Sequence, residues 1–404
     1  MQSWRIERSS ATSRDGLRHA QTGKSEDHEL LAEFGNVKAG STAAGAYNRQ
    51  AMAGVPDARP FNRALPCYEP AQTISSELHP MKAVLCHRFG TPDDLVLGDI
   101  PDPVAVAGEV VAKVAAVGLN FFDTLIVSGK YQTKPPFPFS PGGEFAGVVE
   151  SVGAGVKAFK PGDRVMGYTN FNAARERTAV AADNIVKLPP DLDFDRAAAL
   201  TITYGTAYHA LKYRALMRPG ETLAVLGASG GVGLAAIEVG SIMGGRVIAC
   251  ASADDKVAFA RAHGAHEAVN YEREDLRAAL KRLGGEHGID VIFDPVGGRY
   301  SEPALRSLAW EGRHLVVGFA AGEIPKLPLN LVLLKGCAVL GVFWGAWVRH
   351  AKEDYKEAIA TLARWCAEGK LSCHVQKIYP LAETPAALKA LANREVMGKL
   401  VVRV

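Results

Sequence analysis

The sequence has little of what metal centres and disulfide frameworks require. Six cysteines occur in 404 residues, with no Cys-x-x-Cys pair and no other metal-ligand spacing. Five of them lie in or beside apolar surroundings, where a free cysteine behaves as a small hydrophobic residue. The six cysteines are Cys67, Cys86, Cys250, Cys337, Cys366 and Cys373. This usage predicts reduced thiols in a cytoplasmic protein.

Charge of one sign and long apolar runs are also scarce. Lysine and arginine total 46 against 43 for aspartate and glutamate, and the net charge of +3 is too small to favour nucleic acid as a partner. No apolar run approaches the roughly 20 residues that span a bilayer, so we expect no membrane partner. The length allows two domains.

The first 80 residues lack sustained periodicity at the helical or the strand period. No apolar segment follows the N-terminal charges as in a secretory signal, and scattered acidic residues disfavour a transit peptide. Regular patterning begins abruptly at Met81. Residues 1–80 are therefore interpreted as a disordered extension or as the result of a mis-assigned start.

Short strands separated by Gly and Pro turns dominate residues 81–204. Strands are predicted at 109–117, 145–152 and from Arg164 onward. Near Thr206 the pattern changes to strands that alternate with helices. The predicted strands are 221–226, 246–250, 290–294, 313–318 and 337–342, and the predicted helices are 231–243, 254–263 and 354–368. Such alternation is typical of an α/β fold with a doubly wound parallel sheet.

A glycine-rich loop is the strongest functional signal. The run Gly227-Ala-Ser229-Gly230-Gly231-Val232-Gly233 directly follows a predicted strand and opens a predicted helix. Glycines allow the tight turn and let backbone amides approach a pyrophosphate, which the helix N-terminus also favours. The alternative is a plain strand-to-helix turn. We expect a dinucleotide to bind here.

The end of the next strand distinguishes NADP from NAD. NAD-binding folds of this type place Asp or Glu there for the ribose hydroxyls, but this strand ends Cys250-Ala-Ser252. Ser252 can donate to a 2′-phosphate and Lys256 can neutralise it, so the sequence predicts NADPH. Asp254 and Asp255 are interpreted as helix N-capping residues, and Lys256 could also be an ordinary solvated lysine.

The β-rich part and the cofactor part together resemble the medium-chain dehydrogenase/reductase superfamily. Zinc-dependent members have a catalytic Cys where this chain has Asn120, after Gly118 and Leu119, and a Gly-His-Glu segment where it has Gly142-Gly143-Glu144. The four close cysteines of a structural zinc lobe are also missing. A zinc site needs three or four converging ligands, so no metal site is expected.

The resemblance is strongest to the zinc-independent quinone oxidoreductase (zeta-crystallin-like) branch. It is carried by Val117–Thr124, Ser128–Tyr131, Pro141–Gly147, Thr206–Tyr208, the glycine loop and Gly398–Val402. It implies a GroES-like catalytic domain at 81–204, a Rossmann NADPH-binding domain at 205–342 and a return to the catalytic domain at 343–404.

By matching position, the resemblance also implies cofactor-binding residues. The loop contributes Ser229, Gly230, Gly231, Val232 and Gly233. At the nicotinamide end it implies Asn120, Asp123 and Thr206, with Gly318 and Phe319 flanking the ribose and ring. His209 is implied less directly, and the alternative is a buried or surface histidine without a cofactor contact. Ser252, Lys256 and Tyr271 would surround the 2′-phosphate, and Lys399 would reach toward the cofactor.

The implied reaction is transfer of hydride or electrons from NADPH to a quinone or a similar conjugated carbonyl. Such acceptors need no metal, because conjugation spreads the developing charge. A hydrogen-bond donor near the oxyanion would help. Asn120 and Tyr131 are the catalytic candidates, with Tyr131 a possible proton donor or, alternatively, a partly exposed loop aromatic.

Family members pair the strand equivalent to Cys337–Val342 across a homodimer, which would cover an exposed edge. Trp344 and Trp347, just beyond it, are expected in core or dimer packing, or as a wall of the substrate cleft.

Three alternatives remain open. An enoyl or alkenal reductase would use the same cofactor geometry on a carbon–carbon double bond. A non-catalytic NADPH-binding or RNA-binding protein is disfavoured by the mild charge. A zinc alcohol dehydrogenase would need the missing Cys and His.

Overall fold

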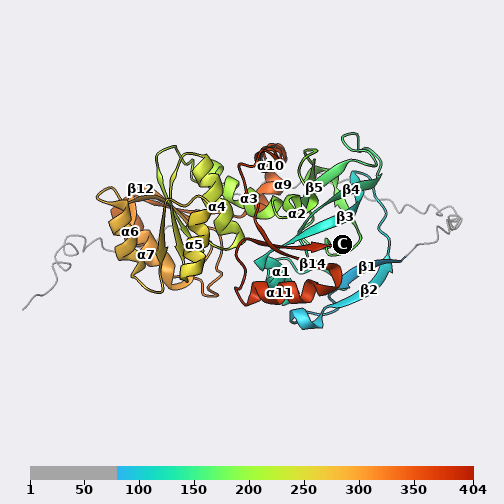
Figure 1. Ribbon diagram of the computed structural model, residues 1–404, viewed down its shortest axis with the longest axis horizontal. Coiled ribbons are helices and arrows are strands. Elements are labelled where there is room, and N and C mark those ends of the chain that lie inside the picture. The colour runs from blue at the N-terminus through green and yellow to red at the C-terminus, as the bar shows by residue number, and fades with distance from the viewer. Residues whose placement is uncertain (1–79) are drawn as a thin grey trace, which may run out of the picture. The chain divides into compact units, whose positions relative to one another are not determined.

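Two large sheets and one two-stranded sheet organise residues 80–404, the part of the chain that the computed structural model describes (Figure 1). The interpretation of residues 1–80 as an extension or a mis-assigned start falls outside the described residues, apart from Pro80. The fold is α/β, with a β-rich part and a Rossmann-like part built on a parallel sheet.

The Rossmann-like part contains a six-stranded sheet in the order β10-β9-β8-β11-β12-β13, and every neighbouring pair is parallel. The strands are β8 (Thr222–Leu226), β9 (Arg246–Ala251), β10 (Glu267–Asn270), β11 (Ile289–Asp294), β12 (Leu308–Val316) and β13 (Ala338–Gly341). β8 is buried at every position, as expected for a central parallel strand covered on both faces.

Helices cover both faces of this sheet. They are α4 (Gly231–Ile242), α5 (Asp254–Ala262), α6 (Leu276–Gly284), α7 (Ser301–Arg306) and α8 (Leu329–Lys335). Alternate residues of β8 enter different cores: Leu223 and Val225 pack in the core that contains α4, and Ala224 and Leu226 in the core that contains α6 and α7. A parallel sheet with helices packed on both faces is the doubly wound arrangement.

The β-rich part contains a seven-stranded sheet in the order β14-β15-β3-β4-β5-β7, with β6 also paired to β3. Its strands are β3 (Glu109–Leu119), β4 (Glu144–Val152), β5 (Arg164–Tyr168), β6 (Arg177–Ala181), β7 (Ile185–Lys187), β14 (Val375–Pro380) and β15 (Lys399–Arg403). A separate hairpin joins β1 (Pro80–Leu85) to β2 (Val96–Pro101). The C-terminal strand β15 thus lies beside β3, almost 300 positions earlier in the sequence.

The remaining helices belong to the β-rich part or connect it to the parallel sheet. They are α1 (Phe121–Val127), α2 (Phe194–Ala198), α3 (Thr201–Tyr208), α9 (Trp344–His350), α10 (Lys352–Ala367) and α11 (Thr384–Ala392). α3 continues into a π-helical segment, His209–Arg214. One core joins the two parts, because Ala116 and Met166 of the β-rich sheet belong to the same cluster as α3 and α4.

Most predicted elements are confirmed, and several were missed. The strands at 109–117, 145–152 and 246–250 and the helices at 231–243 and 354–368 are present, with no end shifted by more than two residues. The change to alternating helices and strands begins before Thr206, since α2 precedes it and α3 contains it. Within residues 80–404, no helix has the length and apolar character needed to cross a membrane.

Candidate active site

The glycine loop connects β8 to α4 at the carboxyl edge of the parallel sheet. Gly227 has a positive φ of 60°, and a Cβ at Gly233 would lie 2.3 Å from the Gly227 carbonyl oxygen. Only glycine allows so close an approach. Gly230 is the N-cap of α4 and no side chain caps the helix, so the first backbone N–H groups remain available to an anion.

The other expected cofactor residues follow neighbouring strands at the same edge. Ser252 follows β9, Tyr271 follows β10, and Gly318 and Phe319 follow β12. Because the strands are parallel, their carboxyl ends meet along one side of the sheet. The topology therefore brings residues spread over more than 90 positions to one edge.

Ser252, Tyr271 and Lys256 form a polar corner beside β9. Burial is the main cause that raises the pKa of Tyr271 to about 12, and the nearby Ser252 hydroxyl acts in the opposite direction. The Tyr271 ring packs against Tyr300 at 4.4 Å between centroids. The Lys256 ammonium donates to the Arg394 carbonyl oxygen at 3.0 Å. The corner offers hydroxyl donors and one cation.

The capping interpretation of the two aspartates is wrong. The N-cap of α5 is Ala253, and Asp254 and Asp255 lie in the first helical turn. Asp254 instead accepts from the Asn270 amide at 2.6 Å and pairs with Arg273 at 2.6 Å. Asn270 is the last residue of β10 and Arg273 follows that strand, so the competing contacts were not visible in the local sequence.

A segment near the C-terminus runs across the edge of the sheet, and the sequence argument missed most of it. The Gly398 N–H donates to the Ser229 carbonyl oxygen at 2.8 Å, and Gly398 forms a parallel bridge with Gly230. Arg394, with a positive φ of 61°, donates to the Ala320 carbonyl oxygen at 2.7 Å. Arg394 therefore links α5, through the bond of its carbonyl oxygen to Lys256, with the loop of Ala320 that follows β12.

Asn120 lies at the N-terminus of α1, where β3 ends, inside a buried polar network. Its backbone N–H donates to Asp123 Oδ2 at 2.7 Å, and its Nδ2 donates to Glu144 Oε1 at 2.8 Å. The Lys399 ammonium donates to Asn120 Oδ1 at 2.6 Å and to Glu144 Oε1 at 2.8 Å. Glu144 Oε2 accepts the Ile202 N–H at 2.7 Å. Glu144 is fully buried and was not among the expected site residues.

Burial controls ionisation around this network. It raises the pKa of Asp123 to about 7, although the Asn120 and Gly142 N–H groups and Lys399 favour its charged form. Burial, and then the charge of Asp123, raise the pKa of the half-buried Tyr131. Tyr131 is therefore protonated at neutral pH and packs against Phe122 at 5.4 Å between ring centroids.

Aromatic side chains gather around α3 and α9. Trp344 is buried and packs edge-on against Tyr168 at 5.1 Å, and Trp347 stacks on His209 at 4.5 Å. Burial, with a smaller effect of Arg214, lowers the pKa of His209 to about 4, so its imidazole is neutral at pH 7. Thr206 is buried one turn before His209 on α3. Both tryptophans thus pack within the described chain, as expected.

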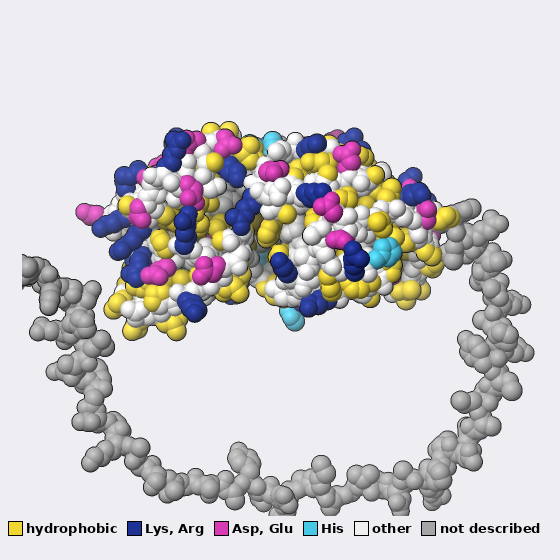
Figure 2. Space-filling view, turned by 90° about the horizontal axis from the view of Figure 1, so that it is seen from below, with side chains coloured by type: hydrophobic (Ala, Val, Ile, Leu, Met, Phe, Trp, Pro, Cys, Tyr) yellow, Lys and Arg dark blue, Asp and Glu magenta, His cyan; other side chains and the backbone are white. Residues whose placement is uncertain are grey.

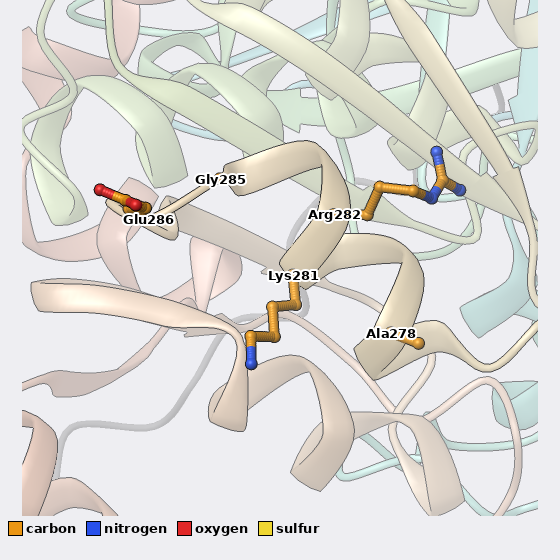
Figure 3. Close-up of a pocket in the computed structure, with 5 residues that line it drawn as sticks. All are labelled: Ala278, Lys281, Arg282, Gly285 and Glu286. Carbon is orange, nitrogen blue, oxygen red and sulfur yellow. The ribbon is translucent and has the colours of Figure 1, made fainter. Parts of the chain in front are cut away.

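A surface depression beside α6 lies away from this site. It is lined by Ala278, Lys281, Arg282, Gly285 and Glu286 (Figure 3). Lys281 and Arg282 point in different directions in Figure 3, so their charges do not converge on one ligand.

Comparison with known proteins agrees with this arrangement. Residues 106–190 match the alcohol dehydrogenase GroES-like domain, and residues 231–364 match the family described as zinc-binding dehydrogenase. Quinone oxidoreductase-like protein 2 of Rattus norvegicus is 37% identical over 323 residues, which cover 80% of this chain and 91% of the relative. The chain belongs to the quinone oxidoreductase family of medium-chain dehydrogenases/reductases. It is accordingly an oxidoreductase.

Other members of the family cover the same part of the chain. The quinone oxidoreductase of Homo sapiens is 36% identical over 325 residues, which cover 80% of this chain and 97% of the relative. The crystal structure of the Escherichia coli quinone oxidoreductase complexed with NADPH has a TM-score of 0.75 and 29% identity, and it covers 80% of this chain and all of the other.

Proposed function

We propose that this oxidoreductase binds NADPH and transfers hydride or electrons from it to a quinone or a similar conjugated carbonyl acceptor, without zinc. The observation that best supports this is the glycine loop with its uncapped helix N-terminus, placed at the same sheet edge as Ser252, Lys256 and Tyr271. The Escherichia coli relative is complexed with NADPH, which supports the same cofactor here.

The residues fit NADPH better than NADH. The loop backbone would hold the pyrophosphate, with Ser229, Gly230, Gly231, Val232 and Gly233 contributing. At the strand end that distinguishes the two cofactors, Ser252 is exposed and carries no charge, and Lys256 is close to the Arg394 segment. At the end of β9 itself, a 2′-phosphate would meet the Ser252 hydroxyl rather than a carboxylate, with Lys256 one helical turn further on.

The reaction needs little from the protein beyond orientation and a dry site. NADPH, when bound, supplies the hydride. We propose that Thr206, His209, Gly318 and Phe319 border the nicotinamide end, with Asn120 and Tyr131 as hydrogen-bond donors to the acceptor oxygen. Tyr131 is the candidate proton donor because a tyrosine hydroxyl carries its proton at neutral pH. The partly exposed aromatic side chains of Tyr131 and Trp347 suit a planar conjugated acceptor.

Zinc independence is supported by what occupies the expected ligand positions. A Cβ at Gly143 would lie 2.5 Å from the Phe122 ring, so a histidine there would displace that ring. Asn120 and Glu144 supply oxygen atoms, but both accept from the Lys399 ammonium, which would repel a divalent cation. Elemental analysis of the purified protein is expected to give far less than one zinc per chain, and one zinc per chain would contradict the proposal.

Steady-state kinetics test the function directly. Oxidation of NADPH and NADH is followed with 9,10-phenanthrenequinone and, separately, with a simple 2-enal. Turnover of the quinone with NADPH is expected. Turnover of the enal alone would reassign the enzyme as an alkenal reductase with the same cofactor. Binding of NADPH without turnover of either acceptor would contradict the acceptor class.

We also propose a homodimer that forms through β13. This strand is the last in its sheet, so one of its edges has no partner strand in the described chain. Next to it, Leu329, Leu333 and Leu334 of α8 are 78%, 79% and 71% exposed. Exposed leucines beside an open strand edge suit a second copy of this chain.

Domain limits, location and other partners complete the proposal. We place the domains at 81–204, 205–342 and 343–404, because β14 and β15 return to β3. NADPH-dependent turnover by residues 81–404 alone is the check of the first boundary.

Free, buried cysteines in the described chain support a cytoplasmic location, which cell fractionation tests. On the face in Figure 2, basic and acidic side chains are interspersed, which disfavours nucleic acid as a partner.

A further inference from the structure

Lys399 is a buried cation whose donors are all used within the protein. Its side chain is 3% exposed, and its Nζ lies 2.8 Å from the Leu119 carbonyl oxygen, 2.6 Å from Asn120 Oδ1 and 2.8 Å from Glu144 Oε1. An ammonium group has three protons and no acceptor. No proton of Lys399 is left for a phosphate or a ribose, so its charge acts on Asn120 and Glu144.

The Lys399–Glu144 pair selects one of the two orientations of the Asn120 carboxamide. The carbonyl oxygen faces the ammonium, and Nδ2 donates to the Glu144 carboxylate at 2.8 Å. A flipped amide would place its N–H groups against the ammonium and its oxygen against the carboxylate. The second Nδ2 proton has only the Gly118 carbonyl oxygen at 3.4 Å, beyond the usual hydrogen-bond range. That proton is available to another acceptor.

We propose that Lys399 and Glu144 are positioning residues that orient and polarise Asn120 as a hydrogen-bond donor to the acceptor oxygen. The inference rests on the proposed function, in which Asn120 stabilises the developing oxyanion. A cation at the amide oxygen draws electron density from the amide nitrogen and so strengthens its N–H as a donor. Because the network is buried, this effect is weakly screened.

The same lysine also touches the phosphate loop. A Cβ at Gly231 would lie 2.9 Å from Lys399 Cδ, so the lysine stem fits against this glycine. The neighbouring Gly398 N–H is bound to Ser229 in the loop. The residue that orients Asn120 is thus anchored to the segment expected to hold the cofactor pyrophosphate.

Variants that neutralise the pair separate positioning from stability. Lys399→Met and Glu144→Gln are each expected to lower the melting temperature, because each leaves one buried charge unpaired. The double variant removes both charges and is expected to recover most of the melting temperature. Its NADPH Kd should stay within about threefold of wild type, while its kcat with 9,10-phenanthrenequinone stays at least about tenfold lower.

A mutant cycle with Asn120→Ala tests whether the pair acts through Asn120. In that background, neutralising the pair should change kcat by less than about twofold, since its target is gone. If the loss of kcat caused by Asn120→Ala and the loss caused by neutralising the pair multiply, the proposal is overturned. A double variant that recovers both the melting temperature and kcat would also overturn it.

A readout without turnover keeps the inference separate from the proposed function. The Asn120 side-chain amide signals in ¹⁵N-labelled protein are assigned by their loss in Asn120→Ala. The double variant should shift both proton signals, because it removes the charges on either side of the amide. If wild type reduces neither acceptor, the proposed function fails while this spectrum still decides the positioning role. Unchanged amide signals would overturn the positioning role.

Discussion

At the scale of single residues, Asp123 shows how burial and hydrogen bonding compete. Two backbone N–H groups donate to its carboxylate, yet burial dominates and raises its pKa to about 7. Between pH 4 and 7 the folded state therefore binds a proton that the unfolded state has released. This group makes folding less favourable as pH rises through that window, by about 1.4 kcal/mol for each unit by which the pKa is raised.

We predict that ¹³C NMR of labelled aspartate finds Asp123 titrating near pH 7. Asp94 provides an internal control, because the Thr91 N–H and then Arg88 lower its pKa to about 2. An Asp123 pKa below 5 would show that the hydrogen bonds outweigh burial.

His209 imposes the opposite pH dependence. Its pKa of about 4 lies below that of a free histidine, so the unfolded state takes up a proton first as pH falls below about 6.5. Its contribution to stability is present above that pH and is lost between about pH 6.5 and 4. Replacing His209 with glutamine should flatten the acid side of a plot of melting temperature against pH. An unchanged acid side would contradict the lowered pKa.

Cofactor choice is also decided by single residues. Ser252→Asp places a carboxylate at the end of β9, where it would repel a 2′-phosphate and accept from ribose hydroxyls. The ratio of kcat/KM for NADPH to that for NADH should fall at least about tenfold, or roughly 1.4 kcal/mol. Lys256→Ala should raise the KM for NADPH alone. Lys281→Ala, on the depression in Figure 3, is the matched control and should change neither cofactor's KM.

At the scale of elements, the turn from β8 to α4 depends on Gly233. A methyl group there would meet the Gly227 carbonyl oxygen at 2.3 Å and Ala228 Cα at 2.9 Å, and both are backbone atoms that cannot rotate away. Gly233→Ala should cost about 1–3 kcal/mol of stability and weaken NADPH binding at least about tenfold. Gly230→Ala controls for the stability effect, because its Cβ would contact only Gly227 O at 3.6 Å. Equal melting temperatures for the two variants would contradict the argument.

The sequence predicted the elements whose local residue pattern is typical of one kind of secondary structure only. The continuous apolar run predicts β8, and the glycines that follow it predict the start of α4, both from neighbouring residues alone. α3 was missed because all eight of its residues are buried, so it shows no amphipathic pattern. Glu144 was missed as a site residue for a different reason: its partners Lys399 and Ile202 are distant in sequence. Long-range pairing of that kind has no local signature.

At the scale of the whole molecule, the open edge at β13 predicts the oligomeric state. Leu329→Asp with Leu333→Asp would place two charges on the exposed face of α8 beside that edge. Burying them at a dimer interface would be costly. We expect light scattering to give twice the chain mass for wild type and one chain mass for the variant. Because both leucines are exposed within the described chain, the variant should fold. A variant that stays dimeric would place the interface elsewhere, and a monomeric wild type would refute the dimer.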